Sequence, residues 1–294
     1  MKRYKGEAGL LLVAMIWGSG FIAGAIGLDY LTPYQAMAGR FFVSSLLLDI
    51  VFFKRLKGIR IETLRKGIII GVFLFGAFLL QTLGLELTTP SRNAFLTAVN
   101  VVIVPFLGFI LLKKRLNWKE TAGAILALIG VGVLSLDLSG SINPGDFLSF
   151  LCSIAFAFHI FFTGLYSQEE SAIELTVIQM NVSFLLSAIV LAARGGTMLG
   201  AQPEGYAAIV YLGVFSTTIA FFLQTYSQKF TNETRAAVIM STEALFATVF
   251  SVIVFSEVIS TRMIIGAILI FTAILFPMVI KTRATDHTEA AEGL

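Results

Sequence analysis

The chain has 294 residues, of which 57% are apolar and only 13% are charged, and its mean hydropathy is +0.88. A soluble domain is roughly 45–50% apolar and about 25% charged. No soluble fold of this length could bury so many apolar side chains or cover itself with so few charges. The composition therefore excludes a soluble enzyme, a soluble nucleic-acid-binding protein and a disordered chain. It predicts a helical membrane protein with several spans.

Ten long apolar runs follow one another along the chain, separated by short charged or turn-forming segments. A transmembrane helix needs about 20 such residues, whereas a transmembrane strand is shorter and alternates in polarity. We therefore expect an all-α polytopic membrane protein with ten transmembrane helices and no extramembrane domain. The predicted spans are 8–28, 34–53, 67–85, 93–112, 121–136, 147–168, 175–193, 205–228, 236–256 and 263–280.

The basic residues gather on one side of the predicted membrane. When the connections are numbered alternately from the N-terminus, one side carries 17 Lys and Arg residues, and the other carries Arg92, Arg194 and Arg262. Basic residues in short loops stay in the cytoplasm. Both termini are therefore predicted to be cytoplasmic, and the net charge of +3 reflects topology. The first apolar run is longer than the core of a cleaved signal peptide, so we interpret it as the first span.

The sequence resembles itself when it is shifted by 143 residues. The shift aligns Phe78, Gln81, Thr82 and Arg92 with Phe221, Gln224, Thr225 and Arg235, and the sequence Gly-Ala-Ile-Leu at 123–126 with its copy at 266–269. Each copy holds five spans, an odd number, so the second copy must be inverted. Inverted repeats are frequent in secondary transporters, although some channels also contain them. We expect two inverted five-helix repeats at 1–140 and 141–282, followed by a short cytoplasmic tail at 283–294.

Four short motifs lie in or near the predicted spans. They are Trp-Gly-Ser-Gly-Phe at 17–21, Arg-Phe at 40–41, Ala-Phe-Leu-Thr at 94–97 with the apolar run up to Pro105, and Glu243 followed by Glu257. Together they resemble the EamA-like branch of the drug/metabolite transporter superfamily. This resemblance implies ten helices in an inverted five-plus-five repeat, a central cavity, and the export or uptake of small metabolites. It also favours a bacterial inner membrane.

Two charged residues lie well inside predicted spans, where a charge costs about 2.5–3.5 kcal/mol on insertion scales. Glu243 is either a proton-binding or cation-binding carboxylate beside a cavity or a neutral packing group. We predict the first role, which would couple transport to an ion. Arg40 either holds an anionic group of the substrate or fixes helix packing, and the structural role is the simpler assumption near a helix end.

Uncharged polar side chains supply further candidates for substrate binding. Gln81 and Gln224 are related by the repeat, and Asn100 takes the position that is related to Glu243. Their amides could bind a polar solute or could form hydrogen bonds between helices. His159 lies in the middle of the sixth predicted span. It could be a proton site, but a hydrogen-bonded core histidine is the simpler interpretation.

Aromatic and basic residues complete the predicted site. Trp17 and Phe21 share one face of the first span and could stack on a substrate or simply pack. Arg92 and Arg235 are related by the repeat, and inversion would place one near each mouth of a cavity, as gates or as interfacial anchors. The Gly-x-x-x-Gly sequence at 20–24 indicates close helix packing and leaves a homodimer as an alternative use.

No motif in the sequence indicates catalysis, a metal or a cofactor. There is no P-loop, no metal-ligand cluster and no nucleophile beside a base, and the single Cys152 cannot form an intramolecular disulfide. The expected partners are the lipid bilayer, a small-molecule substrate and protons, and not nucleic acid. We predict a secondary active transporter for a small polar or amphipathic metabolite that works as an exporter. A channel or passive facilitator is the alternative.

Overall fold

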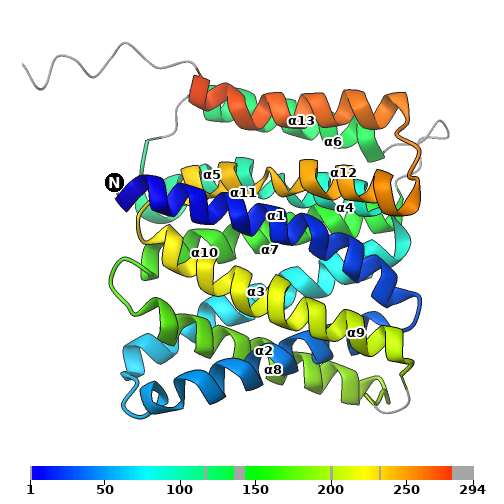
Figure 1. Ribbon diagram of the computed structural model, residues 1–294. Helices are drawn as coiled ribbons and strands as arrows, with labels where there is room; N and C mark the ends of the chain where they lie inside the picture. The colour runs from blue at the N-terminus through cyan, green and yellow to red at the C-terminus, as the bar shows by residue number, and fades with distance from the viewer. Residues whose placement is uncertain (1, 116–117, 136–142, 199–200, 232, 280–294) are drawn as a thin grey trace, which may run out of the picture.

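The computed structural model describes residues 2–115, 118–135, 143–198, 201–231 and 233–279, so the predicted tail at 283–294 lies outside the described residues. Every regular element within those ranges is helical, and the helices lie side by side in one bundle (Figure 1). They are α1 (Lys2–Leu28), α2 (Pro33–Leu56), α3 (Ile61–Leu87), α4 (Pro90–Thr97), α5 (Asn100–Leu112), α6 (Trp118–Ser135), α7 (Pro144–Tyr166), α8 (Ala172–Ala193), α9 (Pro203–Tyr211), the π-helix η1 (Leu212–Ile219), α10 (Ala220–Gln228), α11 (Glu233–Met240), α12 (Glu243–Phe255) and α13 (Thr261–Val279).

These helices account for all ten predicted spans. Eight segments of the described chain are long and apolar enough to cross a membrane, and α6 and α13 contain the shorter apolar stretches Thr121–Leu134 and Thr261–Leu275. Three of the eight segments are made of more than one helix: α4 with α5, α9 with η1 and α10, and α11 with α12. The predicted all-helical membrane fold is confirmed.

The two ends of the bundle differ in how helices begin there. We call the end that holds the start of α1 and the end of α13 the proximal end, and the opposite end the distal end (Figure 1). Four helices that start at the distal end have proline at their first turn: α2, α4, α7 and α9. Proline suits this position because its fixed φ is helical and a first-turn N–H would have no partner. Thr32, Thr89 and Asn143 cap three of these helices with side-chain oxygens.

The first helix of the second half of the chain runs opposite to the first helix of the first half. The Thr88 hydroxyl, just after α3, donates a 2.6 Å hydrogen bond to Asp146 in the first turn of α7. Gly84 near the end of α3 also contacts Gly145 at the start of α7. The helices α3 and α7 are therefore antiparallel. Because α2 reverses the chain between α1 and α3, α7 also runs opposite to α1, as an inverted repeat requires.

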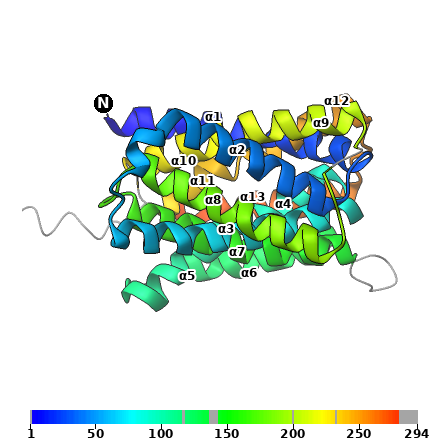
Figure 2. The ribbon, with the colours of Figure 1, turned by 90° about the horizontal axis from the view of Figure 1, so that it is seen from below.

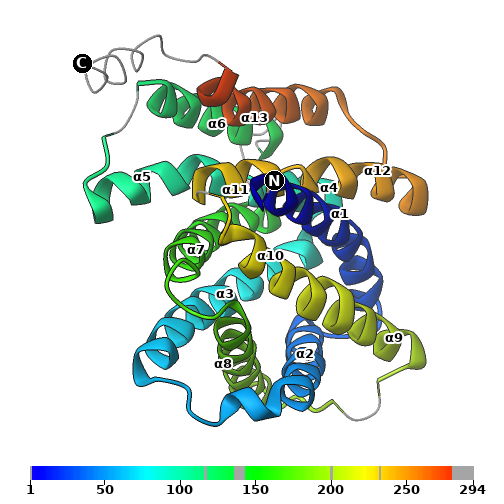
Figure 3. The same cartoon turned by 60° about the vertical axis from the view of Figure 1, so that its left-hand side comes forward.

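The bundle has an outer pair of helices beside a larger core. The helices α6 and α13 pack along each other, and Gly130 and Gly266 bring their backbones close together. This pair forms a layer of its own next to α4, α5, α11 and α12 (Figures 1 and 3). Figure 2 shows the bundle from below, with α2 and α8 on the side opposite this pair. The core thus lies between α4, α5, α11 and α12 and the helices α1, α2, α3, α7, α8 and α10.

Two spans are broken in the middle, and this corrects the prediction that 93–112 and 236–256 each form one helix. The breaks lie at residues 98–99, between α4 and α5, and at residues 241–242, between α11 and α12. The amides of Val99 and Thr242 donate to the carbonyls three residues earlier, at 3.3 and 3.2 Å. Such bonds tighten the helix locally. The two breaks are 143 residues apart and have the same hydrogen-bond pattern, so the repeat extends to the backbone.

A cavity between the two repeats

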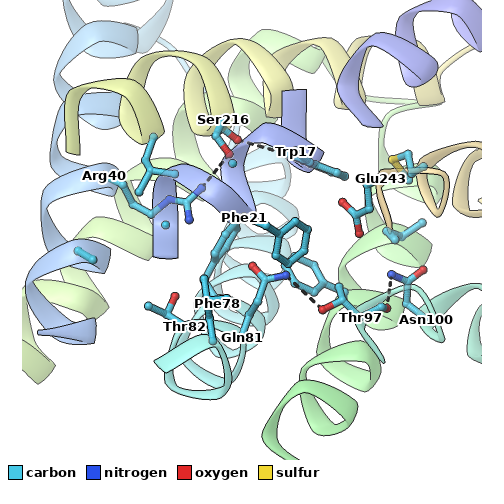
Figure 4. A pocket seen from close by; sticks show the side chains of 18 residues that line it. Trp17, Phe21, Arg40, Phe78, Gln81, Thr82, Thr97, Asn100, Ser216 and Glu243 are labelled. Atoms are coloured by element: carbon cyan, nitrogen blue, oxygen red, sulfur yellow. Dashed lines mark hydrogen bonds between the residues drawn. The ribbon is translucent and has the colours of Figure 1, made fainter. Parts of the chain in front are cut away.

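A cavity lies in the middle and distal part of the bundle, and its empty space of about 730 Å³ includes the part that is open to solvent. On α1 its lining starts at Trp17 and continues toward the end of the helix, and on α3 it continues to Leu85. The helices α2, α7 and η1 and both helix breaks complete the wall (Figure 4). The lining residues are Trp17, Gly20, Phe21, Gly24, Ala36, Arg40, Phe78, Gln81, Thr82, Leu85, Thr97, Asn100, Phe156, Ile160, Leu212, Ser216, Met240 and Glu243.

Arg40 forms one side of this cavity. Its Nε donates to the Thr217 hydroxyl at 2.9 Å, and its Nη2 donates to the Ser216 hydroxyl at 3.2 Å. The guanidinium carbon lies 4.1 Å from the ring centre of Phe78, close enough for a cation–π contact. The side chain is buried, and within the described residues no carboxylate pairs with it. The guanidinium is thus oriented by neutral groups beside an open space.

The π-helix η1 supplies the groups that orient Arg40. A π-helix has wider turns than an α-helix and occurs often at functional sites. Here it presents Ser216 and Thr217 to α2, and the Trp17 indole N–H donates to the Ser216 carbonyl at 3.0 Å. The corresponding stretch of α3, 143 residues earlier, is ordinary α-helix. The two repeats therefore differ in the segment that contacts Arg40 in this structure, which is a π-helix in the second repeat and an α-helix at the related position of the first.

Glu243 and Asn100 lie at the two helix breaks. Each is the first residue of the second half-helix of its span, α12 for Glu243 and α5 for Asn100, and both are buried. The Asn100 amide nitrogen donates to the Thr97 carbonyl at 2.9 Å, while its oxygen has no partner in the described chain. Figure 4 places Glu243 on the opposite side of the cavity from Arg40. An anionic or protonatable group thus faces a cationic group across the same space.

Aromatic rings fill the wall between these two charged groups. Phe21 and Phe78 lie between Arg40 and Glu243 in Figure 4, and Trp17 continues this wall. The Gln81 amide donates to the Thr97 hydroxyl at 3.3 Å and also faces the cavity. The cavity therefore combines an apolar wall with a few polar groups, as binding sites for amphipathic small molecules do.

The cavity brings together most, but not all, of the residues that the sequence nominates for substrate binding. Those that line it are Trp17, Phe21, Gln81, Asn100 and Glu243, together with Arg40. His159 and Gln224 are fully buried and do not belong to the lining. His159 lies 2.8 Å from the Gln179 side-chain oxygen, which fits the simpler interpretation of a core histidine.

The two repeat-related arginines lie at opposite ends of the bundle, outside the cavity lining. Arg92, at the start of α4, forms an ion pair with Asp146 at the distal end and donates to the Leu134 carbonyl at 2.7 Å. Arg235, at the start of α11, pairs with Glu7 of α1 at 2.9 Å at the proximal end. Each pair joins a half-helix of one repeat to the first helix of the other repeat. A gating role for these pairs remains a prediction.

A buried carboxylate fastens the proximal end of α3. Glu170, between α7 and α8, lies 2.8 Å from the Lys66 ammonium and 2.7 Å from the Arg60 guanidinium, and it accepts a 2.7 Å bond from the Thr63 hydroxyl. The hydrogen bond from Lys66 lowers the pKa of Glu170 to about 2, against the opposing effect of its burial. The carboxylate therefore stays ionised and holds the two repeats together at this end.

Several lining residues escape the sequence reasoning. Phe78, Thr97 and Met240 look like ordinary residues of apolar spans, because nothing in a single span shows which face turns inward. Ser216 carries a weak signal, since three hydroxyl residues follow one another at 216–218 within an apolar run. Consecutive hydroxyls have no use on a lipid-facing surface, so they could have nominated this segment.

The sequence profile of the EamA-like transporter family matches residues 4–136 and, a second time, residues 143–279. The chain belongs to this family. An uncharacterized transporter of Archaeoglobus fulgidus is 33% identical over 275 residues, covering 94% of this chain and 86% of the relative. The uncharacterized transporter YetK of Bacillus subtilis is 24% identical, covering 99% and 92%.

A solved crystal structure supports the fold of this EamA-like transporter. It superposes with a TM-score of 0.67 and covers 94% of this chain and 97% of the other, at 17% sequence identity. That likeness concerns the architecture alone. The family match and the apolar helices together identify an integral membrane transporter.

Proposed function

We propose that this EamA-like transporter is a secondary active transporter for a small amphipathic organic anion. The observation that carries the proposal is Arg40, a buried arginine that faces the cavity and has no carboxylate partner among the described residues. A guanidinium fork in this position can bind a carboxylate or phosphate through two parallel hydrogen bonds. Phe21 and Phe78 beside it would receive the apolar part of the same molecule.

The proposed mechanism is alternating access around this cavity. The cavity lies at two half-helix junctions that the repeat relates to each other. Binding sites at discontinuous helices between inverted repeats are typical of secondary transporters. The two repeats can exchange their conformations, and the site then opens to one end of the bundle and afterwards to the other. We place the protein in a bacterial plasma membrane with the proximal end in the cytoplasm, because that end carries most basic residues.

The proposed direction is export, coupled to protons through Glu243. This carboxyl group shares the cavity with the proposed anion site, so it can take up a proton from the outside when the cavity faces outward. The proton would be released into the cytoplasm when the cavity faces inward, before the next substrate molecule binds there. The partner position in the other repeat is Asn100, which does not ionise, so the coupling would depend on one repeat only.

Glu243→Gln tests this coupling because it keeps the shape and hydrogen-bonding capacity but cannot release a proton. We expect the variant, reconstituted in proteoliposomes, to lose accumulation driven by an imposed pH gradient and to retain exchange of labelled for unlabelled substrate. A panel of radiolabelled organic acids identifies the substrate in the same assay. Glu86→Gln, which removes an exposed carboxyl group on α3, is the matched control and should accumulate normally. Normal accumulation by Glu243→Gln would make Glu243 structural.

A channel is the competing function, and the same vesicles separate the two. A carrier exchanges faster when unlabelled substrate is present on the far side, because the loaded site returns more readily than the empty one. A pore shows no such acceleration. Absence of the acceleration for every transported solute would remove the proposal of a carrier.

A further inference from the structure

The distal cavity has a repeat-related counterpart that is closed in this structure. On α3 the cavity is lined by Phe78, Gln81, Thr82 and Leu85. A shift of 143 residues leads to Phe221, Gln224, Thr225 and Gln228 on α10. The first three pairs are identical residues, yet all four side chains on α10 are completely buried, with exposed fractions of 0%. One repeat therefore turns this helix face toward a cavity, and the other packs it away.

The buried amides on α10 are poorly satisfied in the packed arrangement. Neither amide atom of Gln224 has a hydrogen-bond partner among the described residues, and the side-chain oxygen of Gln228 has none either. Buried polar groups are normally paired, because each one loses its hydrogen bonds to water on burial. Two glutamines on one helix face are therefore a poor choice for a permanent core. They suit a face that meets water in a second conformation.

The facing wall on α7 is also polar and also closed. Thr163 and Ser167, which the repeat relates to Gly20 and Gly24 of the distal cavity, are fully buried. Two hydrogen bonds join this wall to α10. The Gln228 amide donates to the Ile160 carbonyl at 3.1 Å, and the Gln168 amide donates to the Gln228 carbonyl at 3.2 Å. A small separation of α7 from α10 would break these two bonds and expose hydroxyl and amide groups on both sides.

We propose that Thr225 and Gln228 of α10, with Thr163 of α7 and Ser167 directly after α7, line a second substrate cavity that opens at the proximal end when the distal cavity closes. This inference rests on the proposed transport function, since it assigns the other face of the same alternating site. Its lining differs in chemistry from the distal cavity, because the position related to Arg40 is Ser183. At that position the proximal cavity offers a neutral hydroxyl group instead of a guanidinium.

Cysteine reactivity tests the proximal cavity. In a Cys152→Ala background, which removes the native cysteine, Thr225→Cys and Gln228→Cys are placed in lipid nanodiscs, where both faces meet water. A small hydrophilic methanethiosulfonate is the probe. Ala220→Cys is the matched control, because Ala220 is equally buried on α10 and its repeat mate Ala77 does not line the distal cavity. Thr225→Cys changes the side chain least, and Gln228→Cys provides a second reading if the first variant does not fold.

We expect Thr225→Cys and Gln228→Cys to react at least about tenfold faster than Ala220→Cys, because a second state populated at a few per cent exposes them while the control reacts only on unfolding. Thr82→Cys, in the distal cavity, marks the rate of an accessible position. If both α10 variants react as slowly as Ala220→Cys while Thr82→Cys reacts rapidly, the proximal cavity does not exist. If the same preparations still exchange an organic acid, the proposed transport function stands without that cavity. Fast reaction without exchange of any organic acid would uphold the cavity and remove the transport proposal.

Discussion

Arg40 is held in a way that leaves part of its fork for a ligand. Two of its nitrogens donate to the hydroxyls of Thr217 and Ser216, and the ring of Phe78 lies against the guanidinium. These neutral partners fix its orientation without neutralising its charge. A guanidinium carries five N–H donors in a planar fork, so donors remain for an anionic group in the cavity. The structural role that the sequence favours and the binding role are therefore compatible in one residue.

Arg40→Gln removes the charge and most of the fork. We expect the KM for the transported organic anion to rise about tenfold to a hundredfold, because a hydrogen bond to a charged group contributes about 1.5–3 kcal/mol and each 1.4 kcal/mol is a factor of ten. Uptake kinetics in proteoliposomes measure the change. Arg65→Gln, at an exposed position of α3, should leave KM unchanged. An unchanged KM for Arg40→Gln would show that Arg40 does not bind the substrate and only anchors η1.

The cost of a buried charge made both charged members of the site visible in the sequence. Arg40 and Glu243 stand out because a charge inside a span needs a reason. Their meeting across one cavity could not be predicted, since 203 residues separate them and the rotation of each helix depends on its neighbours. For the same reason the sequence predicts both Gln81 and Gln224 as binding residues, although the face of α10 that carries Gln224 is buried in this structure.

At the scale of helices, α1 and α12 meet at a glycine beside the cavity. A Cβ atom on Gly18 would collide with the Phe246 Cβ and would lie 2.9 Å from the Ala247 backbone nitrogen and 3.1 Å from the Glu243 carbonyl oxygen. Atoms that close must move apart, and two of the contacts are backbone, which cannot rotate away. This glycine thus sets the distance between α1 and the half-helix that carries Glu243.

Gly18→Ala is expected to separate α1 from α12 and to destabilise the protein by about 1–3 kcal/mol, the usual cost of overpacking. Thermal unfolding in detergent should show a lower Tm, and transport should fall with it. Gly76→Ala is the control, because a Cβ on Gly76, also within a spanning helix, meets no atom within 4 Å. That variant should keep or slightly raise Tm through the better helix propensity of alanine. Equal Tm values for the two variants would contradict the close packing at Gly18.

The helix breaks show what periodicity and composition cannot predict. The broken segments 98–99 and 241–242 contain no proline or glycine, which are the usual markers of a helix end. Their sequences, Ala-Val and Ser-Thr, are compatible with an uninterrupted span. In the first of these spans both half-helices pack on α7, and α4 packs also on α12 whereas α5 packs also on α11. The positions of the spans were predictable because apolar length decides them.

The ion pairs of Glu170 lead to a prediction for the stability at the proximal end. Because the pKa of Glu170 is lowered in the folded protein to about 2, from about 4.5, its ionised form stabilises the fold above pH 4.5, and this contribution disappears as the pH falls toward 2. Glu170→Gln should therefore lower Tm at pH 7, by the equivalent of about 1–3 kcal/mol for a buried acceptor of charged hydrogen bonds. The difference from the unsubstituted protein should shrink between pH 4.5 and pH 2.

Glu169 provides the comparison for this measurement. It also contacts Lys66, at 2.8 Å, but 69% of its side chain is exposed. An exposed ion pair contributes about 0–1 kcal/mol. Glu169→Gln should therefore change Tm little at any pH. A similar loss for both variants, or a loss in Glu170→Gln that does not depend on pH, would show that the Glu170 carboxylate is not the fastening group.

At the scale of the whole molecule, the repeat carries more information than any single motif. The same 143-residue shift relates the two helix breaks, their hydrogen bonds, and the left-handed residues Lys113 and Ser256 that end α5 and α12. The family profile matches twice, with ends 143 residues apart. The state of the cavity has no such signature, because both conformations of a transporter have the same sequence. Only the structure reveals that the face with Gln81 is open and the face with Gln224 is closed.

The orientation in the membrane decides which compartment the distal cavity faces. The proximal end carries the basic residues at the start of α1 and in the connections that follow α2, α5 and α10, whereas the distal side carries Arg92, Arg194 and Arg262. Because basic residues remain cytoplasmic, we predict that the proximal end is inside and that the cavity with Arg40 lies toward the outside.

Cysteine labelling of intact cells checks this orientation in the Cys152→Ala background. Lys57→Cys follows α2 at the proximal end, and Ala193→Cys ends α8 at the distal end; both positions are exposed. We expect a membrane-impermeant maleimide to label Ala193→Cys in intact cells and to label Lys57→Cys only after permeabilisation. The reverse labelling pattern would show that the distal end, and not the proximal end, is cytoplasmic. The cavity that contains Arg40 would then face the cytoplasm, and the amides of α10 would line the path to the outside.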